Sequence, residues 1–241
     1  MWGIVAGLMA LFESHRSSDR EEILGSDAAT RALSVTAVEN DFVTRVYENL
    51  TWAYDWTFGP TLHTGRVQAI QRMGIQPGER VLEVGVGTGI NTLLYPSDCS
   101  VTGIDLTGSM LDKARDRVAR EGIRNVRLLE MDAADLKFAD GTFDIVYAPY
   151  LISVVPDPVA VAHEMGRVCR RGGRVIFLNH FRSANPVLAF FERLISPFTV
   201  HIGFKSDLDL IAFLAQIDLK PVSIEKVNVP KIWSLITCIK A

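Results

Sequence analysis

Cysteine is scarce in this sequence of 241 residues, which has three, at positions 99, 169 and 238. Their number is odd, they lie far apart, and they form no CxxC or Cys/His spacing. The pattern therefore predicts neither a disulfide framework nor a zinc site, and no metal is expected. It is typical of a protein of the reducing cytoplasm.

Long hydrophobic runs are also missing. The longest apolar stretch near the start covers residues 2–12 and is followed by Glu13. A membrane span needs roughly 20 apolar residues, and a signal peptide has a basic start, so the stretch predicts neither. Two interpretations stay open: a hydrophobic foot in a membrane interface, or a helix packed on the protein. Residues 1–37 are expected to combine this segment with a polar tether.

The chain has little net charge, with 25 basic and 28 acidic residues, so nothing global attracts nucleic acid. A local exception is residues 167–205, where seven Arg or Lys accompany a single acid. The same region contains an apolar stretch with helical spacing at 186–195. Basic charge beside an apolar helix suits an anionic membrane surface, although such a helix could equally be a lid over an active site.

Apolar strands alternate with helices through the middle of the chain, which predicts a parallel sheet with helices on both faces. At 48% hydrophobic content, 241 residues suit one α/β domain, expected at 38–241. The predicted strands cover 80–86, 100–106, 126–131, 143–150 and 173–180, with a closing pair at 221–229 and 232–239. The predicted helices cover 38–58, 63–73, 90–95, 108–121, 158–169, 186–195 and 208–217.

The stretch VLEVGVGTG ends the first of these strands with glycines at positions 85, 87 and 89. Glycine lets the backbone turn tightly and approach a ligand without a Cβ in the way. The dinucleotide fingerprint is GxGxxG, whose helix N-terminus meets a pyrophosphate, whereas these glycines are spaced GxGxG. The loop is therefore expected to take a ligand that comes close but carries no phosphate.

Three acids lie at or near the carboxyl ends of three successive predicted strands: Glu83, Asp105 and Asp132. A carboxylate near the loop would repel a pyrophosphate and suit a cation, and one at the next strand end can accept from ribose hydroxyls. Each acid could instead cap the following helix. Together with the glycine spacing, the three indicate a positively charged nucleoside such as S-adenosylmethionine.

The sequence resembles the class I S-adenosylmethionine-dependent methyltransferases over about residues 81–181, in VLEVGVGTGIN, VTGIDLTGSML, LLEMDAADL and FDIVYAPYLISVVPDP. The resemblance implies a Rossmann-like, mostly parallel seven-stranded sheet with an antiparallel C-terminal strand. It also implies a cofactor core at 75–181, while the charge pattern predicts a lid or membrane-facing region at 182–206. GVGTGIN, SVVPDP, LNHF and YDWTFGPTLHTGR are most similar to bacterial phosphatidylethanolamine N-methyltransferases. The ubiquinone and menaquinone methyltransferases are the competing family.

Residue roles follow from this resemblance. Leu106 and Met110 would pack on the adenine, and Tyr54 would reach the cofactor carboxylate or the transferring methyl group. Glu83 would orient the loop and the amino-acid part of the cofactor. The cofactor-binding set implied is Tyr54, Glu83, Gly85, Gly87, Gly89, Asn91, Asp105, Leu106, Met110, Asp132, Ala133 and Tyr147.

Methyl transfer to an amine is an in-line displacement that depends on positioning and needs no covalent nucleophile. The amine must lose a proton first, and aromatic faces hold methylated ammonium ions. Tyr47 and Tyr54 are the preferred aromatic pair, although such a cluster often packs in a core. His180 and Arg182 follow a strand and could meet a phosphodiester, or His180 could be the base. The expected catalytic residues are Tyr54, Tyr150 and His180, and the expected substrate-binding residues are Tyr47, His180 and Arg182.

The expected function is N-methylation of phosphatidylethanolamine by a cytoplasmic enzyme bound peripherally to the inner face of the cytoplasmic membrane. Its partners would be the phospholipid acceptor and anionic lipid, with no nucleic acid. Methylation of a quinone precursor is the enzymatic alternative. A membrane-surface binding module with a vestigial cofactor loop is the non-enzymatic one.

Overall fold

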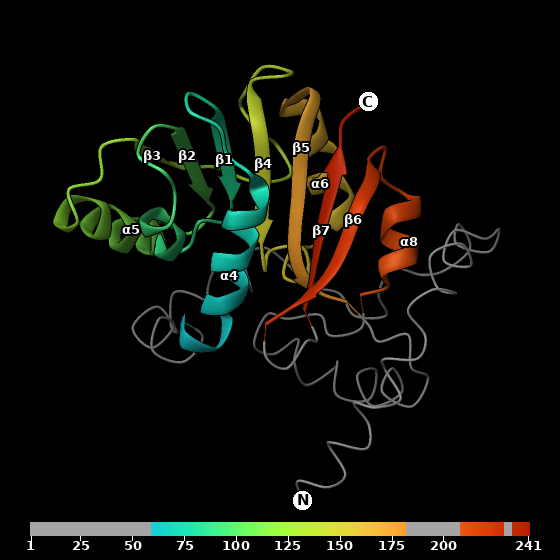
Figure 1. Ribbon diagram of the computed structural model, residues 1–241, viewed down its shortest axis with the longest axis horizontal. Coiled ribbons are helices and arrows are strands. Elements are labelled where there is room, and N and C mark those ends of the chain that lie inside the picture. The colour runs from blue at the N-terminus through green and yellow to red at the C-terminus, as the bar shows by residue number, and fades with distance from the viewer. Residues whose placement is uncertain (1–58, 182–207, 229–232) are drawn as a thin grey trace, which may run out of the picture.

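The computed structural model describes residues 59–181, 208–228 and 233–241. They form a seven-stranded sheet with the order β3-β2-β1-β4-β5-β7-β6 (Figure 1). Strands β1 to β5 are parallel, and β7 runs antiparallel to both β5 and β6. The predicted sheet and its single reversed strand are thus confirmed. The strands are β1 Arg80–Val84, β2 Ser100–Asp105, β3 Val126–Glu130, β4 Phe143–Pro149, β5 Cys169–His180, β6 Lys220–Val227 and β7 Trp233–Ile239.

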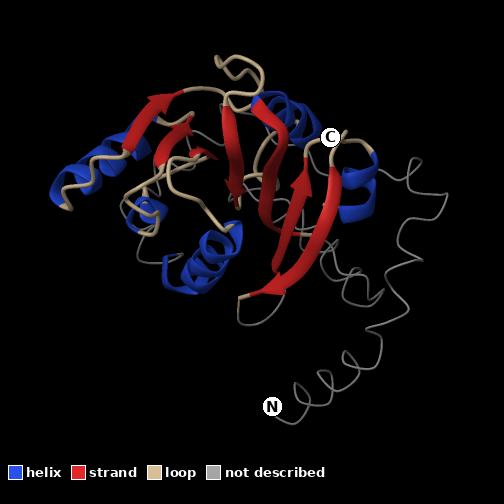
Figure 2. Ribbon diagram, turned by 45° about the horizontal axis from the view of Figure 1, so that its top comes forward, coloured by secondary structure: helices blue, strands red, loops and turns tan. Residues whose placement is uncertain are grey.

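Helices lie on both faces of this sheet, as Figures 1 and 2 show. The described helices are α4 Gly59–Met73, the 3-10 helix η2 Ile90–Leu93, α5 Gly108–Arg120, α6 Pro158–Val168 and α8 Leu210–Ala215. Two hydrophobic clusters separate the faces. Leu82 and Val84 of β1 pack in the cluster of α6 and α8, whereas Val81 packs in the cluster of α4. Side chains alternate between faces along a strand, so Glu83 points to the same face as α4.

Local sequence explains where two of the helices begin. The carboxylate of Asp157 accepts hydrogen bonds from the backbone N–H groups of Val159 and Ala160, and Pro158 occupies the first turn of α6. Asp209 caps α8 in the same way through Ala212. The sequence was misleading at Gly59 and Pro60, which were expected to end a helix but instead begin α4. Proline is tolerated in a first turn because its missing N–H has no partner there.

Several predicted features fall outside the described residues. These are the apolar segment 2–12, the helices expected at 38–58 and 186–195, and the site residues Tyr47, Tyr54 and Arg182. Among the helices that are described, none has the length and apolarity to cross a bilayer.

Three of the basic residues counted at 167–205 lie away from the glycine loop. Arg167 lies in the last turn of α6, and Arg170 and Arg174 lie in the first half of β5, at the opposite end of the sheet from the glycine loop. They are also neutralised locally. Arg167 pairs with Glu164 and Asp140, Arg170 with Asp144, and Arg174 with Glu79. These three residues therefore do not contribute to a basic patch near the site.

Candidate active site

The glycine loop follows β1 at the carboxyl ends of the parallel strands. Gly85, Gly87 and Gly89 have φ angles of 77°, 56° and 75°, which side chains rarely adopt. Their surroundings differ. A Cβ on Gly89 would lie 2.9 Å from the Cβ of Ala114, and one on Gly85 would lie 2.9 Å from Leu151 Cδ1. A Cβ on Gly87 would meet no atom within 4 Å, so Gly87 borders open space.

Glu83 supports this loop from within the protein. Its two carboxylate oxygens accept hydrogen bonds of 2.6 Å from Asn91 Nδ2 and from the Tyr95 hydroxyl. The side chain has no exposed surface, and burial raises its pKa to about 7. Glu83 was expected to orient the loop and the amino-acid part of the cofactor. Both of its oxygens bond to the segment that follows the loop, which agrees with a role in fixing the loop.

Asp105 joins the loop to the end of β2. Its carboxylate accepts 2.8 Å from the N–H of Gly87 and 2.9 Å from the N–H of Thr107. Burial raises its pKa, and these two hydrogen bonds oppose that rise. Each carboxylate oxygen has a further lone pair, so the group can still accept from a ligand hydroxyl. Leu106 beside it is 38% exposed, whereas Met110 is 2% exposed.

Asp132 lies just beyond β3 and accepts a 2.8 Å hydrogen bond from the N–H of Ala134. This bond closes a local turn and caps no helix, because β4 is the next described element after β3. Asp132 and its neighbour Ala133 are only half-buried, so both keep surface at the carboxyl end of the sheet.

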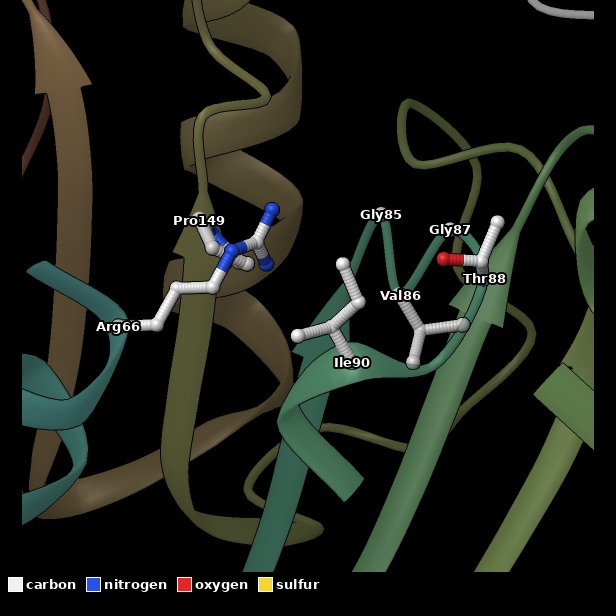
Figure 3. A pocket seen from close by; sticks show the side chains of 7 residues that line it. All are labelled: Arg66, Gly85, Val86, Gly87, Thr88, Ile90 and Pro149. Atoms are coloured by element: carbon white, nitrogen blue, oxygen red, sulfur yellow. The ribbon is translucent and has the colours of Figure 1, made fainter. Parts of the chain in front are cut away.

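Arg66 is a site residue that the sequence analysis missed. Figure 3 shows its side chain reaching from α4 toward Pro149, in a pocket shared with Gly85 and Gly87. The residue is 5% exposed, and its Nη1 donates to Asn91 Oδ1 at 3.3 Å. Among the described residues, its Nε has no hydrogen-bond partner. A buried guanidinium with donor capacity to spare is a binding point for an anionic group.

The signal for Arg66 was weak, because a single arginine in a helix 19 residues before the first glycine is usually a surface residue. Thr88 and Ile90 complete the pocket lining with Val86.

Tyr147 and Tyr150 lie at the end of β4, on the face that α4 covers. Tyr147 is fully buried, and its hydroxyl has no hydrogen-bond partner within the described part of the chain. Tyr150 has a φ of 57°, rare for a bulky residue, and its hydroxyl donates to the carbonyl of Leu62 at 3.0 Å. The Arg66 guanidinium lies 5.0 Å from the centre of the Tyr150 ring. Tyr150 thus holds Arg66 and α4.

His180 is the last residue of β5 and is buried, with its ring edge-to-face against Trp233 at 5.6 Å. The preceding Asn179 accepts from Ser153 and donates to the His180 carbonyl at 2.7 Å. His180 therefore lies at the end of the sheet that carries the glycine loop, as the sequence predicted. In the described ranges, no group of three or more His, Cys, Asp or Glu could hold a metal ion.

Comparison with known proteins places these features in a family. Residues 82–177 match the model of a methyltransferase domain. The chain is 44% identical over 172 residues to a phosphatidylethanolamine N-methyltransferase of Cereibacter sphaeroides, covering 70% of this chain and 83% of that protein. It is 31% identical over 160 residues to a demethylmenaquinone methyltransferase of Staphylococcus aureus strain MRSA252, covering 63% of this chain and 64% of the relative.

Solved structures share the fold. A phosphoethanolamine N-methyltransferase 2 of Haemonchus contortus, in complex with S-adenosyl-L-methionine, superposes with a TM-score of 0.66 at 19% identity, covering 83% of this chain and 59% of that one. A SAM-dependent methyltransferase from Aquifex aeolicus gives a TM-score of 0.55 at 15% identity, covering 82% and 98%. At these identities the likeness concerns the fold alone.

Proposed function

Because this chain belongs to the S-adenosylmethionine-dependent methyltransferases, we propose that it methylates the amine of phosphatidylethanolamine. The observation that carries the proposal is the 44% identity across 83% of a phosphatidylethanolamine N-methyltransferase. The demethylmenaquinone methyltransferase is matched at 31% over 64% of its length. Fold alone does not choose between these acceptors, because one fold serves many.

The described residues fit the cofactor at both of its ends. Gly87 leaves room where a Cβ would project, and Asp105 retains acceptor capacity for the ribose hydroxyls. Arg66 supplies a buried cation with an uncommitted Nε for the carboxylate of the methionine part. When bound, S-adenosylmethionine supplies an electrophilic methyl group on a sulfonium. Glu83 and Asn91 would act by fixing the loop and Arg66.

The adenine is assigned to the surface between the ends of β2 and β3. Leu106 would cover one side of the ring with its exposed side chain, and Asp132 with Ala133 would meet its edge. Met110 is only 2% exposed, so it would support the adenine site from the protein interior. Tyr147 stays in the proposed cofactor set for the methionine end, because it lies on the same sheet face as Arg66 and Glu83.

The acceptor side is assigned to the carboxyl end of β5. His180 would accept the proton that the ethanolamine ammonium must lose, or donate to the phosphodiester beside Arg182. Tyr54 and Tyr47 are retained as aromatic partners of the amine. Tyr150 would act through Arg66, since its hydroxyl is committed to α4. Positioning of the two reactants would provide most of the rate acceleration.

Membrane contact belongs to this proposal as well. The acceptor is a bilayer lipid, so the enzyme would work as a peripheral protein on the inner face of the cytoplasmic membrane. Residues 1–37 and the region 182–206 of the domain 38–241 would supply the contacts, and they lie outside the described residues.

The decisive experiment is incubation of the purified protein with labelled S-adenosylmethionine and bilayers of defined lipid. Label in monomethyl-phosphatidylethanolamine, absent with Gly87→Ala, would support the proposal. Label in demethylmenaquinone or a ubiquinone precursor, with none in phosphatidylethanolamine, would assign the protein to the competing acceptor. Vesicle binding without any affinity for S-adenosylhomocysteine would indicate a binding module.

A further inference from the structure

Asn228 lies after β6, far from the glycine loop in sequence, yet it is linked to Arg66. It is 3% exposed, and its φ of 67° is one that asparagine adopts more readily than most residues. Its Nδ2 donates at 3.0 Å to the hydroxyl of Tyr150. That hydroxyl donates in turn to the carbonyl of Leu62 in α4 at 3.0 Å. The amide and the phenol therefore tie the end of β6 to the first turns of α4.

Gly65 makes this approach possible. A Cβ at position 65 would lie 2.7 Å from the Tyr150 hydroxyl and would collide with Asn228 Oδ1. Glycine inside a helix costs about 1 kcal/mol relative to alanine. The sequence retains it at the point where α4 touches Asn228 and Tyr150, and the next residue is Arg66.

Tyr150 links the contact between Asn228 and α4 to the position of the Arg66 guanidinium. Its hydroxyl takes the two hydrogen bonds described above, while its ring lies under Arg66 at 5.0 Å and meets Trp233 edge-to-face at 4.9 Å. The positive φ of Tyr150 costs on the order of 1–3 kcal/mol, and such a conformation persists only where surrounding contacts hold it. Asn228 is one of those contacts.

We propose that Asn228 is a positioning residue for the cofactor: through Tyr150 and the α4 docking at Gly65, it holds Arg66 where the methionine carboxylate binds. The inference rests on the role assigned to Arg66 under the proposed function. It means that the β6–β7 end of the sheet, which adds no side chain to the pocket of Figure 3, sets affinity for one end of the cofactor.

The test compares two ligands by isothermal titration calorimetry. S-adenosylhomocysteine carries the amino-acid carboxylate, and 5′-methylthioadenosine has the same nucleoside without it. Arg66→Met is expected to weaken S-adenosylhomocysteine binding about 10- to 100-fold and to leave 5′-methylthioadenosine within about twofold. Asn228→Gly, which keeps the positive φ, is expected to show the same selectivity at about 3- to 10-fold.

The double variant separates positioning from general damage. If Asn228 acts through Arg66, then adding Asn228→Gly to Arg66→Met causes no further loss of affinity, because coupled residues are not additive. Equal weakening of both ligands by Asn228→Gly, or additive losses in the double variant, would overturn the proposal. Neither binding measurement includes the substrate that accepts the methyl group, so the result does not depend on which lipid is methylated.

Two further variants distinguish a specific effect of Asn228 from a general loss of folding. Asn125→Gly removes an amide that donates to Pro96 and Cys99, away from α4, and is expected to leave the binding of both ligands unchanged. Should Asn228→Gly fail to fold, Asn228→Asp keeps the size but cannot donate. The Tyr150 hydroxyl must then turn to the new carboxylate and release Leu62. Selective loss of S-adenosylhomocysteine affinity is expected again, and its absence in a folded Asn228→Asp protein would refute the role.

Discussion

The hydroxyl of Tyr95 donates a 2.6 Å hydrogen bond to Oε2 of Glu83, and Asn91 donates at 2.6 Å to the other oxygen. The carboxyl group therefore has two donors but no exposed surface. Burial outweighs the hydrogen bonds and the nearby Arg66, and its pKa rises to about 7. A loop support whose charge changes near neutral pH links the stability of the fold to pH.

Glu83→Gln should therefore change how stability depends on pH. In the unfolded chain Glu83 loses its proton near pH 4.5, whereas in the folded protein it keeps the proton up to about pH 7. The folded state binds more protons in this window, so Glu83 makes the free energy of unfolding fall as pH rises from about 4.5 to 7, by on the order of 3 kcal/mol.

Urea unfolding of wild type and Glu83→Gln at pH 5 to 8 would measure this contribution. We expect the variant to gain stability relative to wild type as pH rises. Parallel stability curves would contradict the pKa of about 7. Glu121→Gln, at an exposed acid, serves as the control and should follow wild type.

Gly87→Ala should abolish most cofactor binding while leaving the protein folded. Gly87 and Gly122 both have positive φ, at 56° and 66°, and neither would place a Cβ within 4 Å of another atom. Alanine at either position should cost roughly 1–2 kcal/mol of stability. Only Gly87 borders the pocket, so we expect at least a tenfold loss of S-adenosylhomocysteine affinity there and none in Gly122→Ala. Equal affinities in the two variants would remove Gly87 from the site.

Asp105→Asn should weaken S-adenosylhomocysteine and 5′-methylthioadenosine alike, by about tenfold or more, because both contain the ribose. The amide keeps an acceptor for one of the two N–H groups, of Gly87 and Thr107, but turns a donor toward the other. Asp112→Asn, on an exposed acid of α5, is the matched control. Titration calorimetry distinguishes this pattern from that of Arg66→Met, which should affect S-adenosylhomocysteine alone. A selective effect of Asp105→Asn would argue against ribose contact.

Arg170→Gln should leave binding to anionic vesicles unchanged, because Arg170 pairs with Asp144 at the far end of the sheet. Arg182→Gln, by contrast, should weaken it if the region 182–206 meets the membrane. Co-sedimentation with vesicles in low and high salt measures both. The lost ion pair of Arg170 should change stability little, since the arginine is exposed and its charge is screened by solvent. Weaker vesicle binding by Arg170→Gln would place the membrane surface at that end instead.

The sequence was sufficient for the strands and the glycine loop because both depend on local pattern. Apolar runs of strand length indicate β1 and β4, and the glycines at 85, 87 and 89 indicate a tight loop, in which all three have positive φ. The antiparallel last strand followed from family resemblance, since pattern alone left its partner unspecified.

Long-range contacts are what the sequence could not provide. Asn228 and Tyr150 are 78 residues apart, and Arg66 and Asn91 are 25 apart, so no local spacing links either pair. For the same reason, the count of basic residues at 167–205 could not tell where Arg167, Arg170 and Arg174 lie relative to the sheet. Strand β5 runs from Cys169 to His180, so its first arginines and His180 lie at opposite ends of the sheet.

The position of β7 between β5 and β6 also has a consequence for the order of folding on the ribosome. Strand β6 is made before β7, yet within the described sheet it pairs with β7 alone. During synthesis β6 can therefore pair with the sheet only after β7 has been made. Asn228 follows β6 directly, so its hydrogen bond to Tyr150 can form only after the glycine loop has been synthesised.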